Sequence, residues 1–261
     1  MKQAGLDAFQ SFTESLESAL SYMYLDVLGL VTCGYGNLID TPAAATALQW
    51  RKPDGTLATR EEVLAAWSLV ESKQSMAKQG GGRFGVLTNI RLDKEAVQAL
   101  FSSTVERNNV ALCHRFSDFE DWGADAQMAL HSLCWACGNA FRFPKLEAAL
   151  RAVDYATAEV EIEMSKGSNP GNDLRRRNAA NQLMMRNACH VQAYHLDPGV
   201  LYWPVDLARI DQDDAPTAPA ISGVTTTADQ PTVILHPRVP LGRPTLDDPE
   251  LDEDPEDTGR N

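Results

Sequence analysis

The chain has 261 residues, of which 44% are hydrophobic and 23% are charged, a composition typical of a globular protein with an apolar core. Its 36 acidic and 23 basic residues give a net charge of −13, which argues against a nucleic-acid binder or a protein that docks on anionic membranes. No apolar run approaches the ~18 residues of a membrane span. The N-terminus lacks the apolar stretch of a secretory signal peptide, and five cysteines are too few, and odd in number, for a disulfide scaffold.

Apolar periodicity predicts a mostly helical body with one short β excursion near its N-terminus. Residues 5–21 carry apolar side chains at spacings of three and four, which indicates a helix. Residues 26–39 mix β-branched and aromatic residues with glycines, a pattern typical of a short twisted hairpin or loop sheet. Further helices are expected over 60–77, over 92–114, in the apolar run that Gly138 caps, in one or two segments across 143–165, and over 173–194, before Pro198.

Negative charge and proline gather at the C-terminal end. Residues 211–261 hold 12 acids, 3 arginines and 8 of the 14 prolines, so this stretch cannot bury enough surface to fold alone. We therefore predict a folded domain at 1–210 and a disordered acidic tail at 211–261. Residues 231–235 are β-prone and are the one piece of the tail expected to dock on the body. The tail either only solvates the protein or serves as a partner or sorting segment.

Two carboxyl groups and a hydroxyl group near the N-terminus form a candidate catalytic set. Asp26 follows Glu17 by nine residues, and Thr32 follows Asp26 by six. Cleavage of a glycosidic bond needs two carboxyl groups in unlike environments, one protonated and one ionised. Leucines beside Glu17 favour its partial burial and a raised pKa, whereas glycines and backbone donors around Asp26 favour the ionised form. Glu14, the local competitor for Glu17, is interpreted as part of a solvated face.

At these positions the chain resembles the phage T4-type lysozymes. Their signature is a Glu, an Asp nine residues later in a Tyr-x-Asp context, a Gly three residues on, and then Thr-x-Gly-x-Gly. Here the pattern stands as Glu17, Tyr24-Leu25-Asp26, Gly29 and Thr32-Cys33-Gly34-Tyr35-Gly36. The likeness covers about residues 5–195. It departs from the family at 41–87, which is longer here, and at Asn37, where those enzymes often have His.

The resemblance implies a mainly α (α+β) fold of the lysozyme-like kind, with two lobes, a cleft between them and a small N-terminal β-hairpin. It implies an inverting muramidase that acts on peptidoglycan without a cofactor, with Glu17 as general acid, Asp26 as the carboxylate that positions or activates water, and Thr32 as its helper. Candidate substrate contacts are Tyr24, Gly34, Tyr35 and Arg176. The arginines at 175–177 either bind anionic wall groups or close salt bridges.

Other motifs are given structural interpretations. Cys134 and Cys137 form a CxxC late in an apolar helical run, which favours buried structural cysteines over a redox pair. The histidines and cysteines lack the spacing of a metal site, so no metal is expected. Gly80-Gly81-Gly82 is followed by Arg83 and not by the lysine of a phosphate-binding loop. It is expected to form a flexible lid or linker beside the cleft.

Two other function classes stay open at this stage. One is a non-catalytic cell-wall-binding or structural module that kept the fold. The other is an enzyme on a related β-1,4-linked polymer such as chitin, or a lytic transglycosylase. Without a signal peptide, the protein is expected to be made in the cytoplasm and to reach the periplasm or cell wall by phage-encoded lysis or by a specialised secretion apparatus. Delivery as an antibacterial toxin would imply an immunity protein as a partner.

Overall fold

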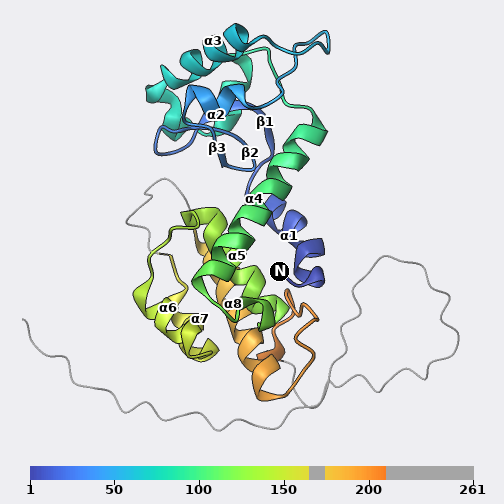
Figure 1. Ribbon diagram of the computed structural model, residues 1–261. Coiled ribbons are helices and arrows are strands. Elements are labelled where there is room, and N and C mark those ends of the chain that lie inside the picture. The colour runs from blue at the N-terminus through green and yellow to red at the C-terminus, as the bar shows by residue number, and fades with distance from the viewer. Residues whose placement is uncertain (165–173, 210–261) are drawn as a thin grey trace, which may run out of the picture.

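The computed structural model describes residues 1–164 and 174–209 of the chain. It is mainly helical with one small antiparallel sheet, as the sequence predicts. Figure 1 shows a small upper lobe that holds the sheet and a larger helical lobe below it, joined by one long helix. The tail expected at 211–261, with its β-prone piece at 231–235, lies outside the described residues.

The first helix ends earlier than the periodicity predicts. Helix α1 (Gln3–Leu16) buries Phe9 and Phe12 against the helical lobe, but it stops before the expected end at residue 21. Glu17 takes an extended conformation at the C-cap, and Leu20, expected on the helix stripe, begins strand β1 (Leu20–Leu25). Pairing of β1 with the next strand satisfies backbone groups that a longer helix would use, so tertiary contacts override the local helix pattern.

Three antiparallel strands form the sheet, where the sequence predicts a short twisted hairpin or loop sheet. Strand β1 pairs with β2 (Val31–Gly34), which pairs with β3 (Asn37–Leu38). Tyr24 lies opposite Thr32 in the β1–β2 ladder. The turn between these strands is closed by hydrogen bonds from the N–H of Asp26 to the Leu30 carbonyl (3.0 Å) and from Gly29 N–H to the Asp26 carbonyl (3.0 Å). Gly29 has a φ of 81°, which explains a glycine at this position.

The small lobe also contains helix α2 (Pro42–Thr46), which the sequence analysis missed, and α3 (Arg60–Glu71). A capping box at Thr59 and Glu62 starts α3. The expected helix at 60–77 ends at Glu71 and gives way to two 3-10 helices, η1 (Gln74–Gln79) and η2 (Gly81–Val86). Gly80 thus links the two 3-10 helices, and Gly81 and Gly82 begin η2. The flexibility expected of this lid or linker stays a prediction.

Helix α4 (Lys94–Arg115) runs from the small lobe into the helical lobe (Figure 1). Its 22 residues span roughly 33 Å at the usual helical rise. One stripe of the helix is buried at spacings of three and four: Val97, Phe101, Val105, Asn108 and Leu112. Because this stripe packs against both lobes, α4 fixes how the small lobe is held above the helical lobe.

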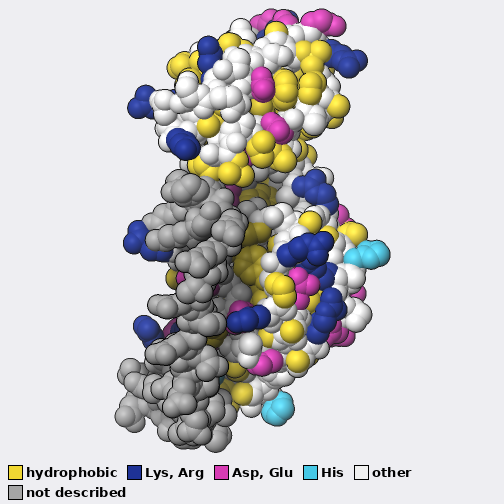
Figure 2. All heavy atoms as spheres, turned by 90° about the vertical axis from the view of Figure 1, so that its left-hand side faces the viewer, with side chains coloured by type: hydrophobic (Ala, Val, Ile, Leu, Met, Phe, Trp, Pro, Cys, Tyr) yellow, Lys and Arg dark blue, Asp and Glu magenta, His cyan; other side chains and the backbone are white. Residues whose placement is uncertain are grey.

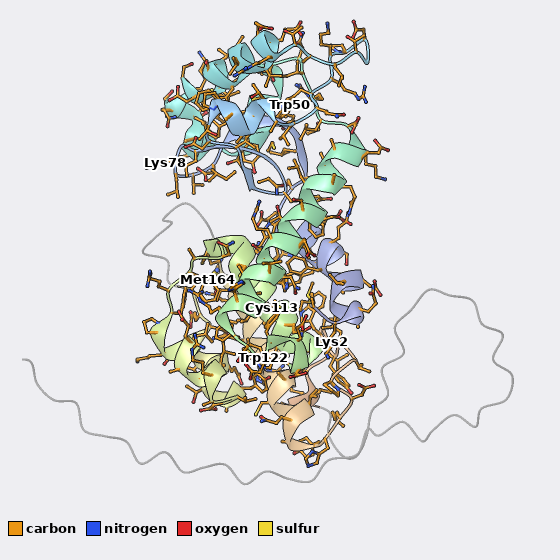
Figure 3. All side chains as sticks on the ribbon, viewed as in Figure 1. Lys2, Trp50, Lys78, Cys113, Trp122 and Met164 are labelled. Atoms are coloured by element: carbon orange, nitrogen blue, oxygen red, sulfur yellow. The ribbon has the colours of Figure 1, made fainter. Side chains whose placement is uncertain are left out.

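The helical lobe is built around α5 (Ala124–Cys137), which is buried over most of its length. Gly138, with a φ of 77°, ends the helix as the sequence predicts. Around it lie η3 (Phe119–Asp121), α6 (Pro144–Arg151), α7 (Tyr155–Glu161) and α8 (Arg175–Ala193). Trp50 and Trp122, labelled in Figure 3, are buried in the small and helical lobes respectively.

The described chain ends in a segment that is tied to α5 and α8, with a last 3-10 helix, η5 (Leu207–Arg209). Asp125 on α5 accepts hydrogen bonds from the N–H groups of Tyr202 (2.8 Å) and Trp203 (3.0 Å), and from the side-chain amide of Asn187 (3.2 Å). Asn187 in turn accepts from the N–H of Leu207 (3.2 Å). Among the described residues, no helix is long and apolar enough to cross a membrane.

Candidate functional site

A cleft of about 420 Å³ opens where the small lobe meets the helical lobe. Figure 2 shows the narrow waist between the two lobes from one side of the molecule. The cleft is lined by the end of α1, the β1–β2 hairpin, the glycine run at the start of η2, the C-terminal part of α5 and the start of α8. Its lining includes Glu17, Tyr24, Asp26, Thr32, Gly36, Ala77, Gly80, Gly81, Gly82, Trp135, Ala136 and Arg177.

Glu17 projects into the cleft from the end of α1. Its N–H donates to the Thr13 carbonyl (2.8 Å), which fixes the backbone where the helix passes into β1. Burial raises the pKa of Glu17, and the opposing effects of the Arg177 guanidinium and the Trp135 N–H do not cancel this rise. Glu17 therefore keeps a proton to higher pH than a carboxyl group in water.

Arg177, on the first turn of α8, is the ionic partner of Glu17. Its Nη2 donates to Glu17 Oε1, and its Nη1 lies 3.3 Å from the Ser132 hydroxyl and 3.4 Å from the Ser132 carbonyl. The guanidinium is almost fully buried. These contacts join α1, α5 and α8 at one point, so Arg177 both orients the Glu17 carboxyl group and supplies positive charge beside it.

Asp26 stands at the hairpin turn with its two carboxylate oxygens in different surroundings. Oδ1 accepts hydrogen bonds from the N–H groups of Leu28 and Leu30, each at 2.9 Å. Oδ2 makes no hydrogen bond within the described residues, and the partly exposed side chain of Asp26 lines the cleft. The backbone thus fixes the carboxylate through one oxygen and leaves the other available to a water molecule.

Thr32 is buried in β2 and reaches the cleft lining beside Asp26. Its hydroxyl donates to the Leu30 carbonyl at 3.0 Å. That bond uses the only hydroxyl proton, so the free lone pairs of Thr32 Oγ1 are left to accept a hydrogen bond from a ligand or water. The position opposite Tyr24 in the sheet puts both side chains on the face that lines the cleft.

Two glycines allow the backbone to approach these side chains closely. Gly36 has a φ of 84°, and a Cβ there would stand 2.8 Å from Glu17 Oε2. A Cβ at Gly81 would stand 2.6 Å from Leu20 and 2.9 Å from the Tyr24 ring. The hydroxyl group of Tyr24 is deeply placed as well, and burial followed by the nearby Glu17 charge raises its pKa. Side chains at either glycine would displace the residues that shape the cleft.

Not every predicted site residue lies in the cleft. Glu17, Asp26, Thr32 and Tyr24 line it together, whereas Gly34, Tyr35 and Arg176 do not. Tyr35 is buried, and its hydroxyl donates to Glu14 at 2.6 Å. This bond lowers the pKa of Glu14, which stays on the exposed face of α1 as expected.

Arg176 is exposed, and its neighbour Arg177 takes the place beside Glu17. The helical periodicity of this segment indicates which arginine faces inward. Arg177 falls on the buried stripe of Asn181, Met184 and Ala188, and Arg176 does not. Trp135 was missed too. Its indole donates to the Tyr35 carbonyl at 2.9 Å, which anchors the ring between the hairpin and α5.

The remaining motifs lie outside the catalytic set. Cys134 is buried, and burial raises its pKa to about 12, in line with a structural role. Cys137 is exposed at the end of α5, which corrects the expectation that both cysteines are buried. Asn37 links β3 to α4 through its amide, 2.9 Å from the Thr104 hydroxyl, and does not line the cleft. No group of metal-binding side chains occurs among the described residues.

Comparison with known proteins adds no family assignment. The sequence matches no protein-family model, and it has no significant match among curated proteins.

Proposed function

We propose that this protein is a peptidoglycan hydrolase, a muramidase that cleaves the β-1,4 bond between N-acetylmuramic acid and N-acetylglucosamine. The observation that carries the proposal is the convergence of two unlike carboxyl groups on one cleft. Glu17 is partly buried beside Arg177 with a raised pKa, while Asp26 is fixed through one oxygen and has the other available. Such a pair supplies an acid and a base to the two sides of a glycosidic bond.

Glu17 acts as the general acid. It transfers its proton to the glycosidic oxygen as the bond to the anomeric carbon breaks. The rise in its pKa through burial keeps this proton available, and the bond from Arg177 holds the carboxyl group in one orientation. Once the proton has left, the Arg177 guanidinium stabilises the carboxylate that forms.

Asp26 and Thr32 direct the water that attacks the anomeric carbon. The water donates one hydrogen bond to Asp26 Oδ2 and the other to Thr32 Oγ1, the two acceptors that the fold leaves available in the cleft. Its oxygen bonds to the anomeric carbon as one of its protons passes to Asp26. A water placed between carboxylate and sugar requires carboxyl groups roughly 6.5–9.5 Å apart and inverts the anomeric configuration.

Analysis of soluble products from purified peptidoglycan tests the proposed reaction. Release of fragments with reducing N-acetylmuramic acid ends, in the α-anomer at first appearance by NMR, is the expected result. Anhydro-muramic ends would instead identify a lytic transglycosylase, and binding without release would identify a wall-binding module. Hydrolysis of chitin but not of peptidoglycan would shift the substrate to the related polymer.

The variant Glu17→Gln tests the acid, with Glu14→Gln as the matched control one turn earlier on the same helix. Glu17→Gln removes the proton donor and keeps the shape, so we expect hydrolysis to fall about 10²–10⁴-fold. Glu14→Gln removes an exposed carboxylate that only accepts from Tyr35 and Gln10, and hydrolysis should stay within about twofold of wild type. Near-normal hydrolysis by Glu17→Gln would rule out Glu17 as the acid.

The same variant has a stability signature. Because the pKa of Glu17 is raised in the fold, ionising Glu17 costs more free energy in the folded state than in the unfolded chain. The stability that protonated Glu17 contributes is therefore lost as pH rises through the folded pKa. Glu17→Gln should therefore melt no lower than wild type at pH 7, and its advantage should vanish near pH 4. A lower melting temperature at pH 7 alone would show that the ionised Glu17–Arg177 pair stabilises the fold.

A further inference from the structure

The edge of the small lobe above the cleft is positively charged, in contrast to the net charge of −13 of the chain. Residues 72–86 contain three basic residues and no acid. Two of these, Lys78 and Arg83, flank the glycine run that lines the cleft, and we call this pair the cationic rim. Figure 3 shows Lys78 at the lower edge of the small lobe, on the side that faces the helical lobe.

The backbone that carries the rim packs against strand β1 of the sheet. Gly81 packs against Leu20 and Tyr24 of β1, and Phe84 is completely buried. The Arg91 guanidinium donates to the Gly85 carbonyl and lies 5.1 Å from the centre of the Tyr22 ring. The backbone of the rim is thus fixed with respect to Tyr24, which lies beside Asp26 in the cleft lining.

The side chains of the rim are not used by the fold. Lys78 and Arg83 are exposed, and neither forms an ion pair within the part of the chain that the structure describes. By contrast, Arg51, Arg115, Arg177 and Arg186 all pair with acids. Two available cations beside the lining of an open cleft are suited to anionic groups on a bound ligand.

We propose that the cationic rim binds the carboxylates of the stem peptides of peptidoglycan, and so selects glycan strands that carry them. This inference rests on the proposed muramidase function. The glycan backbone itself is neutral apart from the groups that its peptides carry, so a cleft that takes only sugars has no use for cations. Ala77, Gly80, Gly81 and Gly82 line the cleft. Lys78 directly follows Ala77 and Arg83 directly follows Gly82, so both cations lie beside this lining, within reach of a substituent on a sugar bound in the cleft.

The attraction between the rim cations and an anionic wall can act only over short distances in this protein. The acidic chain repels an anionic wall over long distances, but at physiological salt the charges are screened beyond ~8 Å. Only cations at the cleft can then offset the repulsion, and each exposed contact of this kind contributes a modest preference. The rim should therefore govern which strand binds and leave the bond-breaking step unchanged.

The test compares wild type, Lys78→Gln/Arg83→Gln and the control Lys52→Gln/Arg60→Gln, which removes two charges from the same lobe away from the cleft lining. The substrates are sacculi with intact stem peptides and the same sacculi after carbodiimide coupling of the peptide carboxylates to methylamine, which keeps the peptides and removes their negative charge. For the rim variant we expect kcat/KM to fall about three- to tenfold on intact sacculi through a higher KM, with no change on the amidated sacculi. At 1 M salt, where the Debye length is ~3 Å, the difference should disappear.

The two proposals fail in different ways. Equal losses on both substrates, or no loss on either, would overturn the assignment of the rim while leaving the muramidase intact. Absence of hydrolysis by wild type would overturn the proposed function. In that case co-sedimentation of the same variants, in a Glu17→Gln background, with intact and amidated sacculi still tests the rim: weaker binding to intact sacculi alone supports it, and unchanged binding overturns it.

Discussion

At the scale of single residues, two opposing effects set the pKa of the Glu17 carboxyl group in the cleft. Burial raises its pKa, and the Arg177 guanidinium acts in the opposite direction. Arg177 is itself nearly buried, and Glu17 is its only ion-pair partner within the part of the chain that the structure describes. The two residues come from helices 160 positions apart, so their geometry sets the protonation state of the cleft.

Removal of the Arg177 charge should move the alkaline limb of the activity profile. In Arg177→Gln the larger of the two influences that lower the pKa of Glu17 is gone and burial remains, so Glu17 should stay protonated to higher pH. We expect the alkaline limb of kcat/KM to shift to higher pH while the maximal rate falls, because the carboxyl group is less well oriented. A pH–rate profile measures both effects.

Arg176→Gln is the matched control, since Arg176 is exposed on the preceding position of the same helix. Its pH profile should coincide with that of wild type. A shift of the alkaline limb to lower pH in Arg177→Gln would contradict the assigned roles of burial and charge at Glu17.

At the scale of elements, Asp125 joins α5, α8 and the last described segment of the chain. Burial raises the pKa of Asp125 to about 6, although three hydrogen-bond donors oppose the rise. Its carboxylate accepts from two backbone N–H groups and from Asn187. Without it, Tyr202 and Trp203 would present buried N–H groups with no acceptor, so this acid decides whether the segment stays on the body.

Asp125→Asn should destabilise the fold, because one amide oxygen replaces two carboxylate oxygens that face three donors. We expect a loss of about 1–3 kcal/mol in the free energy of unfolding, measured by urea denaturation. Since the folded pKa is raised, the contribution of Asp125 is present at low pH and is lost as pH rises through about 6. The gap between wild type and variant should therefore be wider at pH 5 than at pH 7.

Asp121→Asn provides the control, because Asp121 is exposed at the end of η3 and its side chain makes no hydrogen bond in the described residues. Its stability should match that of wild type at both pH values. A gap for Asp125→Asn that widened as pH rose would show that the ionised form of Asp125 is the one that the fold favours.

At the scale of the whole molecule, the charge is distributed unevenly between the folded body and the C-terminal residues. Residues 1–210 carry a net charge of −4, and residues 211–261 carry −9. The segment that Asp125 and Asn187 hold ends before this boundary, and the N–H of Leu207 donates to Asn187 near its end. The body therefore contains its own C-terminal anchor.

Truncation after residue 210 should leave a folded and active body. We expect the urea midpoint to stay unchanged and hydrolysis of peptidoglycan to rise slightly at low salt, because less negative charge repels an anionic wall. The rise should vanish at high salt. A truncation after residue 200, which removes Tyr202 and Leu207, should instead lower the midpoint strongly. Loss of the folded state after residue 210 would show that residues 231–235 dock into the body.

The sequence by itself determined those features that depend only on residues close together in the chain. Asp26 and Thr32 lie six positions apart in one hairpin with Gly29 at its turn, so the local pairing of β1 with β2 brings them together. The same holds for the end of α5 at Gly138, because a glycine with positive φ stops a helix on its own account. The predominance of helix followed from periodicity alone.

The tertiary structure decided which distant residues complete the cleft. Packing of α8 on α5 chose Arg177 over Arg176, because successive helix positions point about 100° apart and only one can face Glu17. Pairing with β2 drew Leu20 from the expected helix into β1, and packing on β1 turned the glycine run at 80–82 into a fixed edge of the cleft. These outcomes depend on contacts between segments far apart in sequence, whose energies no local pattern contains.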